Sequence, residues 1–82
     1  MQDKWLSTDV MKWCVLYRPA GSYTRCVFLN ESQNTCDEAG MGLWENAGSG
    51  DEISILPAVY ADGSTHPKYL QALANNEMTD LN

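Results

Sequence analysis

Apolar and aromatic residues concentrate in two short segments of the N-terminal half of the chain. Residues 11–17 and 23–29 are both rich in the aromatic and β-branched side chains that favour strands. Between them lie Pro19, which presets φ for a turn, and Gly21, which accepts a positive φ. This pattern predicts a β-hairpin whose tip lies at Ala20-Gly21.

Alternation along the two strands predicts which residues share each face of the hairpin. One face is expected to meet the core. Its predicted cross-strand pairs are Trp13 with Phe28, Val15 with Cys26, and Tyr17 with Thr24. The other face is more apolar than a sheet surface in contact with water, so it is either covered by the rest of the chain or bound by a partner. Its residues are Cys14, Leu16, Tyr23, Arg25 and Val27.

Downstream of the hairpin the spacing of apolar residues becomes helical. Thr35 and Glu38 match a capping box, with Thr35 as the N-cap. Apolar residues then recur every three or four positions, and Gly48 is suited to end the helix. The apolar stripe of this predicted helix is Cys36, Ala39, Leu43, Trp44 and Ala47.

The C-terminal part of the chain predicts one more strand and one more helix. Residues 52–60 carry strand-forming side chains, and Pro57, which lacks an N–H, makes this an edge strand or interrupts it. Residues 64–66 precede Pro67 in an order typical of a helix start. A helix is therefore expected over residues 67–75. Its predicted apolar stripe is Tyr69, Leu70 and Leu73.

The predicted order of elements is ββαβα, which is an α+β fold. We expect an antiparallel sheet with both helices packed on one face. Hydrophobic residues make up 44% of the sequence, too many for a disordered chain, and 82 residues suit a single domain over 1–82. Residues 1–9 and 77–82 are expected to be loose.

The charge of the chain is acidic and unevenly distributed. The formal net charge at pH 7 is −6, and residues 31–82 hold nine acidic side chains against one lysine. Such a field repels phosphate backbones, so we expect no direct binding of nucleic acid. It attracts cationic proteins, although the same charge also serves solubility.

Cysteine usage and the N-terminus together favour a cytoplasmic protein. Cys14, Cys26 and Cys36 are an odd number without a C-x-x-C motif, so reduced thiols are expected. Cys14 and Cys26 are nevertheless close enough across the hairpin to pair in an oxidising compartment. The chain starts without the pattern of a secretory signal, and its apolar runs fall far short of the roughly 20 residues that span a bilayer.

No set of residues matches an enzyme, metal or cofactor site. The only histidine, His66, precedes a proline, and no signature pairs it with a cysteine, which leaves a small thiol enzyme as a minor alternative. The cysteines and His66 are too widely spaced for a structural zinc site. The glycines match neither a P-loop nor a dinucleotide fingerprint. We therefore expect no catalysis, no metal and no cofactor.

The arrangement resembles that of small acidic proteins encoded by phages and mobile elements. The residues that carry the resemblance are the hairpin over 13–29, the acidic helix start over 35–39 with 43–45, and the returning strand over 50–55. This topology is similar to that of a phage inhibitor of bacterial RNA polymerase and of several anti-CRISPR proteins. The resemblance implies a host-takeover protein that occludes a host enzyme or defence complex, and it assigns no functional residue.

We therefore expect a non-catalytic inhibitor or adaptor that docks on a basic site of a host protein or protein–nucleic acid complex. The acidic residues expected to form the docking surface are Asp37, Glu38, Glu45, Asp51 and Glu52. A second interpretation places binding on the hairpin, because tyrosine and arginine are frequent in binding hot spots. Its residues are Tyr17, Tyr23 and Arg25. A third is a homodimer or larger particle that buries the apolar hairpin face.

Overall fold

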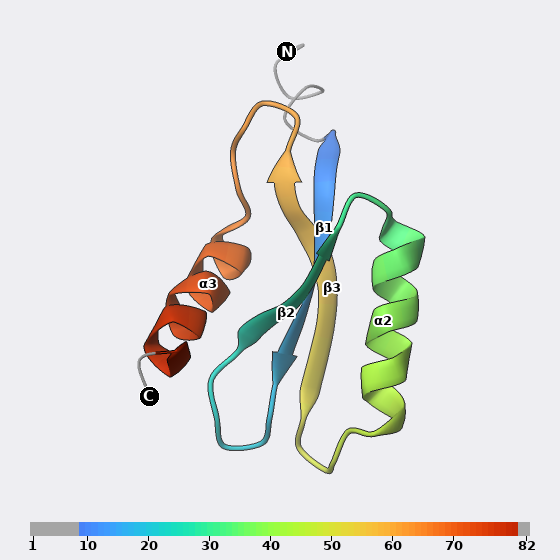
Figure 1. Ribbon diagram of the computed structural model, residues 1–82, viewed down its shortest axis with the longest axis vertical. Coiled ribbons are helices and arrows are strands. Elements are labelled where there is room, and N and C mark those ends of the chain that lie inside the picture. Colours follow the sequence, from blue (N-terminus) through green and yellow to red (C-terminus); the bar gives the residue numbers. More distant parts are fainter. Residues whose placement is uncertain (1–8, 81–82) are drawn as a thin grey trace.

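The computed structural model describes residues 9–80, which form three strands and two helices (Figure 1). The elements are β1 (Val10–Arg18), β2 (Arg25–Asn30), α2 (Gln33–Glu45), β3 (Glu52–Tyr60) and α3 (Pro67–Asp80). The predicted α+β class and the order ββαβα are confirmed. Residues 1–8 and 81–82, which belong to the ends expected to be loose, lie outside the described residues.

The three strands form one antiparallel sheet in the order β2-β1-β3. The predicted hairpin is confirmed: the Ser22 N–H donates to the Pro19 carbonyl at 2.9 Å, and Gly21 has a φ of 73°. β2 begins at Arg25 rather than at residue 23, because the connection from β1 extends further than predicted. β3 continues through Pro57 at the edge of the sheet, so the prediction of an edge strand is confirmed.

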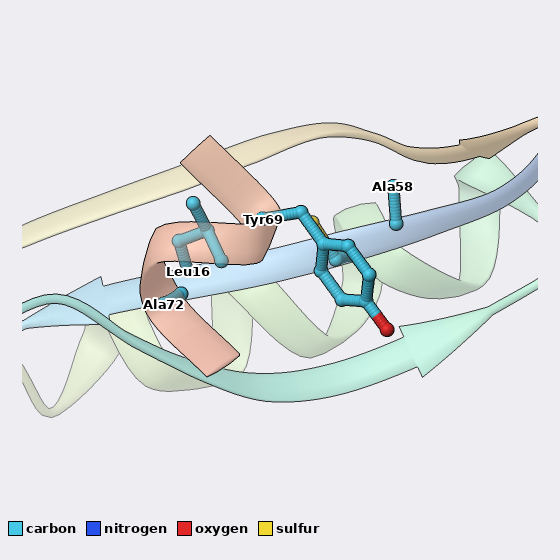
Figure 2. Close-up of a cluster of buried hydrophobic side chains, with 5 residues drawn as sticks. Leu16, Ala58, Tyr69 and Ala72 are labelled. Atoms are coloured by element: carbon cyan, nitrogen blue, oxygen red, sulfur yellow. The ribbon is translucent and has the colours of Figure 1, made fainter. Parts of the chain in front are cut away.

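The two helices lie on opposite faces of the sheet, and the expectation that both pack on one face is wrong. Figure 1 shows the sheet between α3 and α2, and Figure 2 views it from the α3 side with α2 behind. The physical reason is that both faces of β1 are apolar and each needs cover. α3 covers Cys14 and Leu16, while Val15 faces α2. The second apolar face of the hairpin is thus covered by the chain itself.

The α3 side of the sheet holds a closely packed core (Figure 2). Its fully or almost fully buried residues are Cys14, Leu16, Ala58, Tyr69 and Ala72. Tyr69 and Leu73 face this core as predicted, whereas Leu70 is exposed. Ala72 is fully buried in this core, in place of the predicted Leu70.

The register between β1 and β2 differs from the prediction. The observed pairs are Trp13 with Asn30, Val15 with Phe28, Leu16 with Cys26, and Tyr17 with Arg25. A β-bulge inserts Val27 between the partners of Val15 and Leu16. The bulge moves Cys26 to the α3 face, so its predicted pairing with Val15 is wrong.

The ends of α2 also differ from the prediction. Ser32 is the N-cap, and its hydroxyl accepts the Thr35 N–H at 3.2 Å, so the predicted capping box of Thr35 and Glu38 is wrong. Serine is at least as good an N-cap as threonine, and here it acts one turn earlier. The helix ends with Asn46 as its C-cap rather than Gly48.

α3 starts at Pro67, as predicted. His66 immediately precedes it and caps the first turn, because its Nδ1 accepts the Lys68 N–H at 3.1 Å. The helix continues to Asp80, past the predicted end at residue 75. At the predicted end, Asn75 and Asn76 lie beside β2, where both side chains bond to backbone groups of that strand and its approach.

Candidate functional site

An open groove lies between α2 and β3, on the side of the sheet away from α3. Its volume is about 430 Å³, and its walls are mostly apolar. The residues that line it are Asp37, Gly40, Met41, Trp44, Ile53 and Ile55. The four helix residues recur every three or four positions, so they form one stripe along the side of α2.

Gly40 brings the backbone of α2 close to β3. It is buried, and a Cβ at this position would lie only 2.8 Å from Ile55 Cδ1. The missing side chain therefore leaves the floor of the groove free between its neighbours. Two of those neighbours, Met41 and Trp44, are each 64% exposed. Such large apolar side chains side by side at the surface are typical of an interaction site.

Three of the predicted acidic binding residues lie on α2. Asp37 is half-buried at the groove, whereas Glu38 and Glu45 are exposed. Glu38 and Glu45 are two helical turns apart and therefore lie on the same side of the helix. Among the residues that the structure describes, none of the three forms an ion pair. α2 thus presents acidic groups that no cation in the described part of the chain neutralises.

Asp51 has a role within the chain that the sequence did not predict. Its Oδ1 accepts the Ala20 N–H, and its Oδ2 accepts the Gly48 N–H and the Tyr17 hydroxyl, all at 2.8 Å. The two N–H donors, followed by the hydroxyl, lower the pKa of Asp51. The same contact raises the pKa of Tyr17. Asp51 therefore ties the hairpin turn, β1 and the connection between α2 and β3 together.

Glu52 is paired with Arg18 across β3 and β1. Arg18 Nη2 lies 2.8 Å from Glu52 Oε2, and Arg18 Nε donates to Oε1 at 3.2 Å. This two-pronged contact lowers the pKa of Glu52. Because the guanidinium neutralises its charge, Glu52 contributes less to the acidic surface than Glu38 and Glu45 do.

The three hairpin residues predicted as alternative anchors are in different environments. Tyr17 and Arg25 pair across β1 and β2, and both are half-buried. Tyr23 is 68% exposed in the connection before β2. Since the Tyr17 hydroxyl is bonded to Asp51, Tyr23 is the hairpin aromatic that is most available to a partner.

The three cysteines are free thiols. Cys14 and Cys36 are fully buried, and burial raises the pKa of Cys36. The Cys14 thiol donates to the Leu56 carbonyl at 3.5 Å. Cys26 is half-buried, and its interaction with the neighbouring Cys14 thiol lowers the pKa of Cys26. The same interaction, together with burial, raises the pKa of Cys14. No histidine bonds to a thiol in the described part of the chain, since His66 caps α3.

Met41 and Trp44 are the site residues that sequence reasoning missed. Trp44 was assigned to the buried stripe with Cys36 and Leu43, but it belongs to the adjacent stripe. Asp37, Met41 and Trp44 are spaced by four and three positions, as residues on one side of a helix are. A charged residue in that stripe is the signal that marks it as the border of the buried face.

Between residues 9 and 80, no group of three or more histidine, cysteine, aspartate or glutamate side chains is placed to hold a metal ion. In the same described part, neither helix has the length and apolarity needed to cross a bilayer. Comparisons with known protein families, curated proteins and solved structures find no match. The resemblance to phage-encoded inhibitors therefore stays a prediction.

Proposed function

We propose that this chain is a non-catalytic inhibitor or adaptor whose α2 surface docks on a basic site of a host protein. The observation that carries the proposal is the presence on one helix of the exposed side chains of Met41 and Trp44 and of acidic groups that form no ion pair within residues 9–80. Solubility alone accounts for the charge but not for a tryptophan in contact with water. A partner that covers Trp44 removes that unfavourable contact.

The acidic and apolar groups have different tasks in this proposal. Glu38 and Glu45 attract a basic partner from a distance and speed its approach, an effect that salt weakens. Trp44 supplies contact area once the two surfaces meet, as tryptophan does in many binding hot spots. Asp37 lies where both effects combine, because its carboxylate borders the apolar groove.

The proposed partner is a host nucleic-acid-handling or defence complex in the cytoplasm, and the proposed origin of the chain is a phage or mobile element. The support is the resemblance of its hairpin, acidic helix and returning strand to phage inhibitors and anti-CRISPR proteins. A basic groove that normally holds nucleic acid offers the charge that α2 complements.

Self-association through the second hairpin face is a weaker candidate. That proposal requires Cys14 and Leu16 to be accessible, and α3 buries both. Binding through the hairpin tip keeps one favourable observation, the 68% exposure of Tyr23. The test must therefore distinguish binding through Tyr23 from binding through α2.

Affinity capture from a bacterial lysate, with wild-type protein and variants as bait, makes this separation. We expect Glu38→Lys with Glu45→Lys, and Trp44→Ala alone, each to lower recovery of the captured protein at least about tenfold. Tyr23→Ala is the control and is expected to leave recovery unchanged. Circular dichroism verifies that each bait is folded. Loss of capture by Tyr23→Ala, with full capture by the α2 variants, contradicts the proposal.

A further inference from the structure

The outer edge of β3 is closed at one end and open at the other. At the closed end, the Tyr60 N–H donates to the Ser64 carbonyl at 2.9 Å, and the His66 N–H donates to the Ala58 carbonyl at 3.0 Å. Within the part of the chain that the structure describes, no strand or bridge pairs with the same edge over residues 52–57. That stretch is therefore free to accept another strand.

The hydrogen bonds of β2 indicate which backbone groups of β3 face this open edge. The N–H and C=O of Cys26 both bond to the Asn76 side chain, at 3.1 and 3.0 Å, and so point away from β1. Its cross-strand partner Leu16 therefore directs its own backbone groups to the other side, toward Ser54 of β3. The backbone N–H and C=O of Ser54 in turn point toward β1.

Alternation along β3 then places the N–H and C=O groups of Ile53 and Ile55 on the outer edge. Pro57 belongs to the same outward set, which fits its lack of an N–H, because a proline in a sheet is tolerated where no ladder bond is needed. The two edges of the sheet thus differ. Asn75 and Asn76 bond to β2 and its approach. The outward donors and acceptors of Ile53 and Ile55 have no backbone partner among residues 9–80.

The open edge and the groove are one continuous surface. Ile53 and Ile55 present backbone groups at the edge, and they line the groove together with Met41 and Trp44 of α2. A strand added to β3 has alternate side chains on the α2 side, where they meet these walls. Alternate residues of the added strand are roughly 7 Å apart, the same spacing as Ile53 and Ile55 in β3, so two of its side chains lie next to these two residues.

We propose that β3 accepts, as a fourth strand, an extended segment of a basic partner protein that places an arginine and an apolar side chain in the groove. This inference rests on the proposed function and specifies how the partner binds. Charge complementarity selects arginine: its guanidinium matches the carboxylate of Asp37 in two-pronged fashion, and its stem and planar head suit the apolar wall of Trp44.

A second copy of this chain is a poorer occupant of the same edge. Antiparallel pairing of two β3 strands has a two-fold axis perpendicular to the sheet, which places both α2 helices on the same face with their groove sides toward each other. Asp37 of each copy then approaches the other, and each chain carries a net charge of −6. Like charges oppose this arrangement, whereas a basic segment removes the repulsion.

The test uses a synthetic capped peptide with the order threonine, arginine, threonine, valine, threonine, arginine, threonine. Its palindromic order presents arginine and valine on one face for either strand direction. Titration of the labelled protein, followed by NMR, is expected to give saturable binding with a Kd below about 1 mM and shifts confined to β3 and α2. The same peptide with glutamate in place of arginine is expected not to bind.

Backbone pairing is tested by N-methylation of the peptide, which leaves the protein unchanged. An added strand turns the N–H groups of only one alternate set of residues toward β3. We expect methylation of that set to weaken binding at least about tenfold, and methylation of the other set to change it less than about twofold. Equal effects of the two sets overturn strand addition.

Protein variants test the groove. Asp37→Asn and Trp44→Ala are each expected to weaken peptide binding at least about fivefold, because they remove the cation partner and the apolar wall. Glu31→Gln and Leu70→Ala change exposed residues elsewhere and are expected to have less than about a twofold effect. Equal losses in all four variants, or in none, contradict the assignment of the groove.

These outcomes are separable from those of the lysate capture. Reversal of Glu38 and Glu45 that abolishes capture, together with a peptide that fails to bind, supports protein binding by α2 and overturns strand addition. A dimer in light scattering, with the amides of Ile53 and Ile55 protected from exchange, also overturns it, since a second copy then occupies the edge.

Discussion

The two sides of the sheet are built differently although one strand, β1, serves both. On the α3 side, Leu16 and Tyr69 belong to a cluster in which every member is at most 9% exposed (Figure 2). On the α2 side, Val15 and Cys36 are fully buried, but Met41 and Trp44 remain in contact with water beside an open groove. One side is closed and the other is only partly covered.

This difference separates the side that encloses its apolar residues from the side that exposes some of them, in a chain of 82 residues. A small domain buries only a modest share of its apolar surface. A tryptophan in contact with water is therefore apolar surface that the isolated chain does not use for its own core. The α3 side also closes the β2 edge through Asn75 and Asn76, while the α2 side borders the open edge of β3. Within residues 9–80, the groove, the acidic residues of α2 and the backbone groups of β3 without a partner therefore lie close together.

The largest expected effect is the contrast between one apolar truncation on each side. Leu16→Ala leaves a cavity in the closed core and is expected to lower the free energy of unfolding by about 2–5 kcal/mol. Trp44→Ala removes a mostly exposed side chain and is expected to change it by less than about 0.5 kcal/mol. Urea denaturation measures both. Similar losses in the two variants contradict the contrast between the sides.

The next expected effect concerns Asp51, which ties the hairpin turn to β1 and to the connection between α2 and β3. Its pKa is lower in the folded chain, so its contribution to stability is complete above its unfolded pKa, about 4, and is lost as pH falls through the folded pKa. Asp51→Asn is therefore expected to lower the urea midpoint at pH 7 and to have a smaller effect at pH 2. Glu31→Gln serves as the control.

A pair of glycines on α2 gives a smaller and more local effect. Gly42 has no atom within 4 Å of an added Cβ, so Gly42→Ala is expected to stabilise the helix by up to about 1 kcal/mol. Gly40→Ala gains the same helix propensity, but its Cβ meets Ile55, so its net gain is expected to be smaller. Thermal denaturation compares the two. An equal gain at both positions means that Gly40 does not hold α2 against β3.

The smallest expected effect is chemical and concerns the thiols. Cys26 is half-buried, and its interaction with Cys14 lowers its pKa, whereas Cys14 and Cys36 are fully buried. Iodoacetamide applied to the folded protein at pH 7 is therefore expected to modify Cys26 first, because the thiolate is the reactive form. Mass spectrometry identifies the modified residue, and unfolded protein in urea provides the reference. Faster modification of Cys14 or Cys36 means that one of these thiols is not enclosed.

Local chemistry made much of the fold predictable from the sequence. Pro19 and Gly21 identify the turn of the hairpin, and Pro67 identifies the start of α3. The bounds of β3 follow from its residue types, and Pro57 identifies it as an edge strand. In each case the information lies within a few residues of the feature, which is the range over which turn and strand preferences act.

The errors arose where distant or competing contacts decide the structure. No local signal marks the bulge at Val27, and both faces of the hairpin are apolar, so the sequence does not tell which face each helix covers. The N-cap of α2 is Ser32 and not the predicted Thr35. The Ser32 N–H also donates to the Asn30 side chain at 2.8 Å. When two possible N-cap residues lie this close together, the surrounding turn determines which of them caps the helix.

The candidate site was predictable in part. Asp37, Glu38 and Glu45 lie on one helix as predicted. The role of Asp51 depends on hydrogen-bond donors from Tyr17 and from the hairpin turn. Because these residues are far apart in the sequence, no local sequence pattern predicts the contact. The partner contacts predicted for all of these residues are proposals that the binding experiments test.

The central claim is that β3 forms an open edge of the sheet. Hydrogen exchange of the β3 amides in the free protein tests this claim most directly. We expect the amides of Ile53 and Ile55 to exchange at least about tenfold faster than those of Ser54 and Leu56, which bond to β1. The Tyr60 amide, bonded to Ser64, is the internal reference for a closed edge. Uniform protection across β3, or the reverse alternation, contradicts the account.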